Sequence, residues 1–295
     1  MTVSIKRILY IILGALAGLT SWGAQELILA NYSQSYLGLN LLFGITTGMV
    51  FGFMFGGLDG IAIGEKKKAL LSGLVGLAMG ALGGAVSFLL AGVLMVAVSN
   101  GLNAGFTSTT TTILPLSRIV AWTIIGLVLG AAEGLRSRSL RRVLVGGLGG
   151  MVGGLVGGSA LEGCLAWLSW ASLARILGFV LLGLSLGFFL GWFEVRFAYG
   201  RLRVLTGALK NREYLLSRKT TTLGSSWTCD VWLRGSPEVA QLHAGLVRRH
   251  LETTLVNYSK ESPPLLNDDA LHETKELKYE DVIQVGSAKL LYLPL

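Results

Sequence analysis

The strongest constraint in this sequence is a series of six apolar runs, each long enough to cross a lipid bilayer. The runs occupy about residues 8–29, 37–63, 69–98, 118–135, 143–170 and 175–195. A membrane-spanning helix needs roughly 20 mostly apolar residues, so each run predicts one transmembrane helix. Only 14% of the 295 residues are charged, which is typical of a membrane protein and low for a soluble one.

The composition changes near residue 195, where charged, hydroxyl and amide side chains return at the density of a soluble protein. We therefore expect two domains, a glycine-rich transmembrane domain over 1–198 and a soluble domain over 199–295. The fold class expected is an α-helical transmembrane bundle followed by an all-β domain.

Basic residues gather at alternate ends of the apolar runs. The clusters are Lys6 and Arg7, Lys66 to Lys68, then Arg136, Arg138, Arg141 and Arg142, and finally Arg196, Arg201 and Arg203. The intervening loops carry only Arg118 and Arg175, at the start of runs. Cytoplasmic loops are enriched in lysine and arginine, so both termini are predicted to be cytoplasmic in a multi-pass protein of the cell membrane. Lys6 and Arg7 also suit a signal peptide, but the apolar run continues past its weak cleavage pattern at Ala15-Leu16-Ala17.

The net charge of +8 would suggest nucleic acid as the partner of a soluble protein. Here the basic residues lie at the ends of apolar runs, where they contact lipid headgroups and determine topology. The lipid bilayer is therefore an expected partner and nucleic acid is not.

Glycine recurs at a spacing of four within the apolar runs. The ridges are Gly14 and Gly18; Gly44 to Gly64 at every fourth position; Gly76, Gly80 and Gly84; Gly126, Gly130 and Gly134; Gly146, Gly150, Gly154 and Gly158; and Gly183, Gly187 and Gly191. Residues four apart share one helix face, so each ridge lets another backbone approach closely. We interpret the ridges as packing seams within one chain. A homo-oligomer interface and a pore lining are the alternatives.

An acid follows a ridge glycine by three residues in each even-numbered run, at Asp59, Glu133 and Glu194. With the alternating basic loops, this pattern predicts three tandem helical hairpins, over 1–66, 67–140 and 141–203. Acids near the hydrocarbon are functional candidates, and these three could form a cation site or a proton relay. The structural alternative pairs Glu133 with Arg136, and Glu194 with Arg196 or Arg201.

Beyond the last run, the sequence breaks into short β-patterned segments separated by turns. They are Leu202–Leu205, Glu213–Leu216, Asp230–Leu233, His243–Arg248, Thr253–Tyr258, Val282–Val285 and Lys289–Leu293. Many short strands within about a hundred residues are typical of a β-sandwich.

Four short motifs in this region resemble the forkhead-associated (FHA) domain. They are Thr222-Leu223-Gly224-Ser225-Ser226, Cys229-Asp230-Val231-Trp232-Leu233, Leu242-His243-Ala244 and Asp281-Val282-Ile283-Gln284-Val285-Gly286. The resemblance covers about residues 203–295 and implies an FHA-like β-sandwich. It also implies recognition of phosphothreonine peptides by loops at one end of the sandwich. The family positions for peptide contact correspond here to Gly224, Ser225, Ala240, Gln241, His243 and Asn267.

The sequence departs from the family at the phosphate-contacting positions. Ser225 replaces the arginine, Ala240 the serine and Gln241 a basic residue, while Asp268 follows Asn267 in place of glycine. A phosphate needs charge-assisted donors, and serine and glutamine offer neutral ones, so we expect weak or lost phosphothreonine binding. Four cations could supply charge from other positions, namely Arg218, Lys219, Arg248 and Arg249.

These patterns favour a membrane scaffold or signalling adaptor whose FHA-like domain binds a cytoplasmic protein. The alternative is a small-solute or ion channel or transporter regulated by that domain. The residues predict no enzyme, because we find no nucleophile with a base, no metal-ligand cluster and no phosphate-binding loop. No cofactor is expected, and Cys164 and Cys229 lie too far apart in sequence to suggest a metal site.

Overall fold

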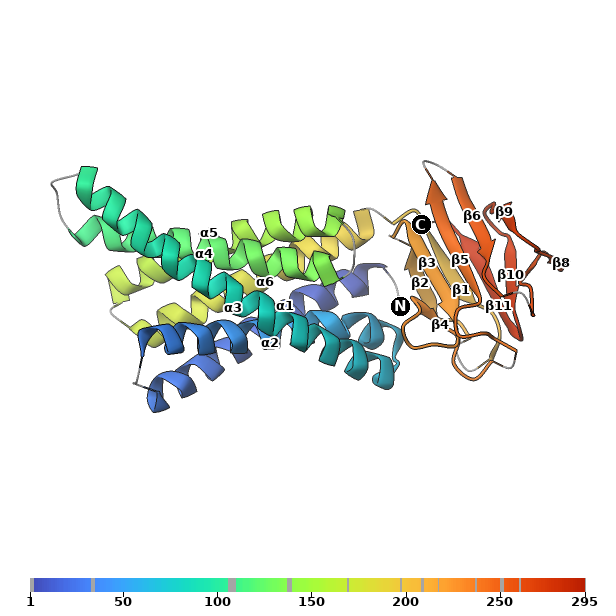
Figure 1. Cartoon of the computed structure of the whole chain (residues 1–295), viewed down its shortest axis with the longest axis horizontal. Coiled ribbons are helices and arrows are strands. Elements are labelled where there is room, and N and C mark those ends of the chain that lie inside the picture. Colours follow the sequence, from blue (N-terminus) through green and yellow to red (C-terminus); the bar gives the residue numbers. More distant parts are fainter. Residues whose placement is uncertain are drawn as a thin grey trace. The chain divides into compact units, whose positions relative to one another are not determined.

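The computed structural model describes residues 3–32, 35–105, 110–136, 140–168, 170–196, 198–207, 210–216, 218–236, 238–249, 252–259 and 261–294. It separates into two compact units, Val3–Phe193 and Glu194–Leu295. The first is helical and the second is a β-sandwich, as the sequence predicts (Figure 1).

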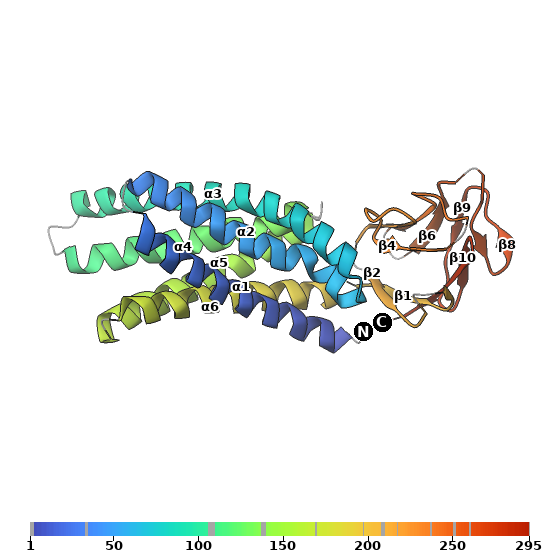
Figure 2. The same ribbon diagram turned by 90° about the horizontal axis from the view of Figure 1, so that it is seen from below.

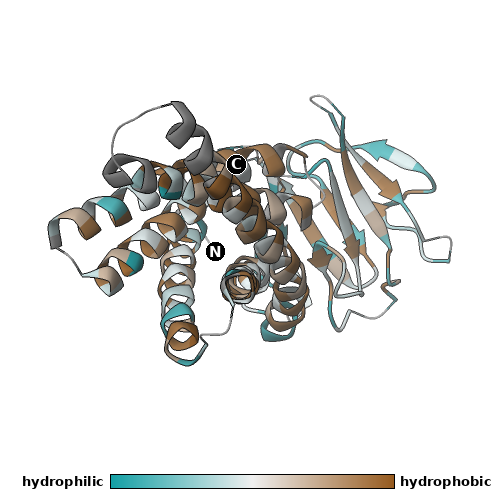
Figure 3. Ribbon diagram, turned by 60° about the vertical axis from the view of Figure 1, so that its left-hand side comes forward, coloured by the Kyte–Doolittle hydropathy of each residue, from teal (hydrophilic) through white to brown (hydrophobic). Residues whose placement is uncertain are grey.

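Six long helices make up the first unit. They are α1 (Val3–Asn31), α2 (Tyr36–Ile63), α3 (Lys66–Gly105), α4 (Thr110–Arg136), α5 (Leu140–Leu168) and α6 (Ala171–Arg196). Each contains a stretch long and apolar enough to cross a membrane, so six long apolar helices stand where the sequence predicts them. Brown, apolar segments predominate along the helices, and teal, hydrophilic ones are fewer there than on the strands and loops of the sandwich (Figure 3). Local signals define α2, because Ser35 caps its start and Gly64 ends it at a φ of 76°.

The glycine ridges join the helices in three antiparallel pairs. A Cβ at Gly48 would overlap the carbonyl oxygen of Gly80 across the α2–α3 pair, and one at Gly80 would overlap that of Gly48. The equivalent contacts are Gly44 with Gly84, Gly52 with Gly76, Gly126 with Gly150, Gly130 with Gly146, and Gly14 with Gly183. The seams therefore join α2 to α3, α4 to α5, and α1 to α6, which cross closely in Figure 2.

This pairing differs from the three hairpins expected from the sequence. The seams fall between successive predicted hairpins, and the third joins the last helix to the first. The tandem repeat stays a prediction, but its units do not hold their closest contacts internally.

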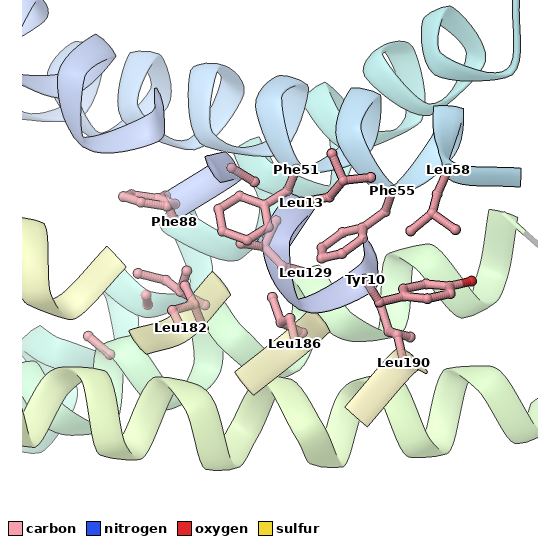
Figure 4. Close-up of a cluster of buried hydrophobic side chains, with 14 residues drawn as sticks. Tyr10, Leu13, Phe51, Phe55, Leu58, Phe88, Leu129, Leu182, Leu186 and Leu190 are labelled. Atoms are coloured by element: carbon pink, nitrogen blue, oxygen red, sulfur yellow. The ribbon is translucent and has the colours of Figure 1, made fainter. Parts of the chain in front are cut away.

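Large apolar side chains fill the space between the helices, as the close-up in Figure 4 shows. The even-numbered helices contribute rows of residues about one turn apart. These rows are Phe51, Phe55 and Leu58 from α2, Ala121, Ile125 and Leu129 from α4, and Leu182, Leu186 and Leu190 from α6. Tyr10, Leu13 and Ala17 of α1 and Phe88 and Ala91 of α3 complete the cluster. The interior at this level is therefore apolar.

Two antiparallel sheets form the sandwich. One has the strand order β2-β1-β11-β10-β7-β8 and the other β4-β3-β5-β6-β9, with only β3 and β4 parallel. The strands are β1 (Gly200–Val204), β2 (Glu213–Leu216), β3 (Thr220–Gly224), β4 (Val231–Trp232), β5 (Ala244–Arg249), β6 (Glu252–Asn257), β7 (Leu265–Leu266), β8 (Asp269–Ala270), β9 (Thr274–Glu276), β10 (Val282–Val285) and β11 (Ala288–Leu293).

The sandwich core is built from inward-facing side chains of both sheets. Leu202 and Leu290 of one sheet, and Leu223, Leu246 and Leu255 of the other, have no exposed surface. All seven predicted strands are present, with ends shifted by a few residues. Four strands were not predicted, namely β3, β7, β8 and β9.

Candidate functional site

Five of the six family positions for peptide contact come together where β3 ends and β5 begins. The backbone N–H of Ser225 donates to the carbonyl oxygen of Ala240 at 3.0 Å, and that of Ser226 donates to Gln241 at 3.2 Å. These bonds join the loop after β3 to the loop before β5. The end of the sandwich therefore has a fixed backbone rather than two independent loops.

Gly224 allows this close approach. A Cβ at Gly224 would overlap the carbonyl oxygen of Gln241. The same carbonyl accepts from the Sγ of Cys229 at 3.2 Å, and the indole of Trp232 donates to the carbonyl of Ser225 at 2.8 Å. Gly224, Cys229 and Trp232 thus fix the positions of the two loops through the backbone carbonyls of Ser225 and Gln241.

His243 is fully buried beneath the same loops. Its Nδ1 accepts the backbone N–H of Ala240 at 3.1 Å, so a neutral ring carries its proton on Nε2. Nε2 has no hydrogen-bond partner among the described residues. Burial lowers the pKa of the His243 imidazole, because the charged form loses its hydration. His243 therefore shapes the loop as a neutral acceptor.

Asn267, the sixth position, lies in the other sheet, in the turn between β7 and β8. Asn267 and Asp268 both have positive φ, 53° and 69°, which fits a tight turn between paired strands. The Asn267 amide donates to Asp281 at 2.8 Å and its oxygen accepts from the N–H of Val282 at 2.9 Å. The side chain thus ties this turn to β10 in the described structure.

The loop surface is neutral and partly apolar. Ser225 and Ala240 are half-buried and Gln241 is exposed. Beside them, Trp227 and Leu242 are 38% and 46% exposed. The sequence analysis did not single out these two residues, because the family motifs concern the positions that contact phosphate or peptide backbone.

Tyr258 extends this apolar surface from the end of β6. It is 42% exposed, and its N–H donates to the carbonyl of His243 at 3.0 Å. A Cβ at Gly245 would meet its ring, so the tyrosine lies over the first residues of β5. Trp227, Leu242 and Tyr258 together with Ser225 and Gln241 are called the loop surface below.

Two of the four alternative cations are engaged elsewhere in the sandwich. Arg218 forms an ion pair with Asp230, whose carboxylate also accepts the N–H of Thr222 at 2.9 Å. Arg248 lies over the ring of Tyr199 at 4.9 Å and donates to Thr253 at 2.8 Å. Lys219 and Arg249 are exposed at the same end of β3 and β5, away from the loop surface.

The side chains of Asp59, Glu133 and Glu194 lie outside the described residues, although their backbones belong to α2, α4 and α6. Arg201, one predicted partner of Glu194, donates to Glu213 and to the carbonyl of Pro294.

Two other acids in the helices form ion pairs that the sequence analysis did not predict. Glu26 of α1 receives two hydrogen bonds from Arg175 of α6, at 2.7 and 3.0 Å, and one from Trp22 at 3.0 Å. Glu162 of α5 pairs with Arg118 of α4 at 3.2 Å. Arg118 and Arg175 are the two basic residues that the sequence places in loops otherwise poor in lysine and arginine. Their unusual position was the signal from which these ion pairs could have been predicted.

The two ion pairs occupy equivalent positions in the α4–α5 and α1–α6 helix pairs, farther along the helices than the glycine contacts. An arginine early in an even helix meets a glutamate late in an odd one. Across the described residues, no group of three or more histidine, cysteine, aspartate or glutamate side chains is placed to hold a metal ion.

Comparison with solved structures finds FHA domains over the C-terminal third. An FHA domain from Chlamydia trachomatis is 16% identical, with a TM-score of 0.31, and covers 33% of this chain and 99% of that one. The N-terminal FHA domain of an S. cerevisiae protein, solved with a phosphothreonine peptide, is 18% identical, with a TM-score of 0.30, covering 33% and 94%. A Synechocystis protein is 22% identical, with a TM-score of 0.29, covering 33% and 97%.

A search of the curated proteins finds no match to this chain. A scan against protein families matches residues 203–294, the sandwich almost from end to end. The six helices precede the matched region. Over residues 203–294 the chain is thus similar in sequence to the family described as the inner membrane component of T3SS, cytoplasmic domain, and the β-sandwich over this region is similar to those of FHA domains.

Proposed function

We propose that this protein is a multi-pass membrane adaptor whose FHA-like domain binds a cytoplasmic protein through the loop surface without requiring phosphothreonine. The observation that carries this proposal is the chemistry of that surface. Its backbone is fixed by the Ser225–Ala240 and Ser226–Gln241 hydrogen bonds, yet its side chains are neutral and apolar. A doubly charged phosphate is held by charged donors, and apolar side chains are better matched by an uncharged peptide.

The description of the matched family supports placing this domain in a membrane assembly. A family of inner-membrane components would act by position, bringing a bound protein to the bilayer. The basic clusters of the helical region support a cytoplasmic location for both termini.

The apolar cluster that crosses the bundle favours the anchor over the channel or transporter, even though polar side chains such as Gln25 and Thr47, which bond to each other at 2.9 Å, are buried elsewhere among the helices. Phe51, Phe55, Leu129 and Leu186 lie within one buried cluster. A solute pathway needs polar side chains or water along its length. Flux measurements in proteoliposomes test this choice, and solute flux above that of empty liposomes would contradict the anchor.

The phosphate part of the proposal is tested by restoring the missing donors. We expect the double variant Ser225→Arg with Ala240→Ser to gain affinity for phosphothreonine peptides. Charged hydrogen bonds contribute about 1.5–3 kcal/mol each, so the gain is roughly ten- to a thousandfold. The matched control is Lys275→Gln, which changes a 52% exposed cation on β9, outside the loop surface. Low-micromolar binding by the unchanged chain, with preference for the phosphorylated peptide, would contradict the proposal.

The docking part is tested by photo-crosslinking in cells. A photoreactive phenylalanine derivative replaces Trp227 or Leu242, and in the control it replaces Tyr279, which is 51% exposed and stacks on Tyr292. We expect a discrete protein adduct from the first two positions and none from the control. Equal labelling from all three positions would show that the loop surface is not the docking site.

A further inference from the structure

Three cations that serve neither the loop surface nor a known site gather at the end of the sandwich where the chain arrives from α6. The N–H of Arg248 donates to the carbonyl of Lys219 at 2.7 Å, and Arg249 follows as the last residue of β5. Tyr199 directly precedes β1, and the guanidinium of Arg248 lies over its ring at 4.9 Å. Lys219, Arg248 and Arg249 therefore lie at the same end of β3 and β5, with Arg248 in contact with the entering chain, and are called the entry cations.

The covalent chain keeps this end close to the end of a helix. α6 ends at Arg196 and β1 begins at Gly200. A fully extended chain spans at most about 3.6 Å per residue, so these four steps cover no more than about 14 Å. Charges interact over a Debye length of about 8–10 Å at physiological ionic strength. If α6 spans a membrane, the entry cations lie within electrostatic reach of the headgroups.

The local balance of charge at this end is positive. Arg196, at the end of α6, and Lys278 add to the entry cations, and the residue after Lys278, Tyr279, donates to the carbonyl of Tyr199 at 3.2 Å. Acids oppose them: Glu252 faces Arg249 across the β5–β6 hairpin, Glu280 follows Tyr279, and the carboxylate of Asp281 accepts the N–H of Lys278 at 2.7 Å. These five cations still outnumber the three acids.

We propose that the entry end of the FHA-like domain binds anionic phospholipid headgroups of the leaflet that it faces. The proposal rests on the membrane anchoring proposed above, but not on the docking role of the loop surface. β3 and β5 run between the two ends, with Lys219 and Arg249 at one and Ser225 and His243 at the other. Headgroup binding at the entry end therefore directs the loop surface away from the bilayer, where a soluble partner reaches it.

Hydrogen exchange of the full chain in lipid nanodiscs tests this inference. The probe is phosphatidylcholine alone, compared with phosphatidylcholine mixed with phosphatidylglycerol. Near a membrane surface each cation contributes about a fivefold change in binding, so we expect amides in peptides 213–224 and 244–257 to exchange roughly fivefold more slowly in the anionic discs. Raising the salt concentration should remove the difference.

The variant Lys219→Gln with Arg249→Gln should lose this protection, because both side chains are exposed and project toward solvent. Lys275→Gln is the matched control, since Lys275 is a 52% exposed cation on β9. It should behave like the unchanged chain. Equal exchange of the double variant and the unchanged chain in neutral discs confirms that the fold is intact.

Two results would overturn the proposal. One is an identical exchange rate in neutral and anionic discs. The other is protection that persists in the double variant or disappears equally in Lys275→Gln. Neither result bears on photo-crosslinking at Trp227, so the two proposals fail independently.

Discussion

In the helical bundle the closest contacts join backbone to backbone across glycines, whereas in the sandwich they join large apolar side chains. Gly48 and Gly80 leave no room for a Cβ, while Leu223 and Leu246 fill the space between two sheets. Both regions are densely packed, but the atoms that make the contact differ.

The difference follows from the solvent that each region meets. Lipid tails are as apolar as leucine, so burying leucine between membrane helices gains little and close van der Waals contact must hold them together. In water, each buried leucine side chain contributes roughly 1.5–3 kcal/mol. Small residues therefore determine pairing in the bundle, and large ones determine stability in the sandwich.

The largest expected effect comes from filling a glycine seam. In Gly154→Leu the new side chain would collide with the backbone of Trp122 and Thr123, separating α5 from α4. We expect loss of the folded protein, measured by size-exclusion profile and thermal unfolding in detergent. Gly163→Leu is the control on the same helix, because nothing lies within 4 Å of its Cβ position. Equal yields of the two variants would mean that this seam does not hold the helices together.

A smaller effect is expected from emptying the sandwich core. Leu246→Ala removes a side chain with no exposed surface, which costs about 2–5 kcal/mol of unfolding free energy. Pulse proteolysis of the full chain in urea reports the stability of this domain. Leu242→Ala, at a 46% exposed position, should change it far less. A similar loss for both variants would show that buried leucine is not what stabilises the sandwich.

The ion pairs between helices test whether polar contacts add to the glycine contacts that hold the bundle together. Glu26→Gln weakens the pair with Arg175, whose two side chains are each 29% exposed, so we expect a cost of about 1–2 kcal/mol, between exposed and buried pairs. Exchanging the charges, Glu26→Arg with Arg175→Glu, should recover part of the thermal stability in detergent. No loss in the single variant would leave the glycine seam as the sole determinant of the α1–α6 pairing.

The smallest expected effect is a pH dependence confined to the sandwich. The pKa of His243 is lowered from 6.5 by burial, so the unfolded chain binds a proton more readily than the folded domain. Stability is therefore full above about pH 6.5 and falls as the pH drops toward the folded pKa, by at most about 1.4 kcal/mol per pH unit. Pulse proteolysis between about pH 7 and 5.5 measures this slope, and His243→Gln should flatten it. An unchanged slope in the variant would assign the titration to another group.

Hydropathy alone was enough to predict the six helices, because a run of twenty apolar residues has few other structures open to it. The partners of the glycine ridges were not predictable in this way. A ridge at Gly14 and Gly18 shows that something packs closely, and nothing in its spacing distinguishes α2 from α6. Pairing depends on contacts between segments distant in sequence, which periodicity along one helix does not encode.

The sandwich shows the same limit at the scale of single residues. The alternation of apolar residues predicted β1 and β10. β3 was not predicted, because it begins with three threonines and ends at a glycine, a composition that is also typical of a loop. Gly224 and His243 both lie beneath the loops between β3 and β5, and a role for them in peptide contact stays a prediction. Asn267 is the residue type that the family has at this position. Its side chain nevertheless bonds to Asp281 and to the N–H of Val282, which sequence spacing could not show.

The seam between α1 and α6 also constrains the order in which the bundle can assemble during synthesis. Gly14 and Gly183 touch in the folded chain but are made far apart during synthesis. At roughly 5–20 residues per second, α1 waits about ten to thirty seconds before its partner exists. Four helices can find their neighbours in that interval, while the face of α1 that carries Gly14 and Gly18 remains uncovered. The bundle closes only as α6 enters the membrane, just before the ribosome begins the sandwich, so closure of the seam marks the moment at which a stable anchor is ready to carry its domain.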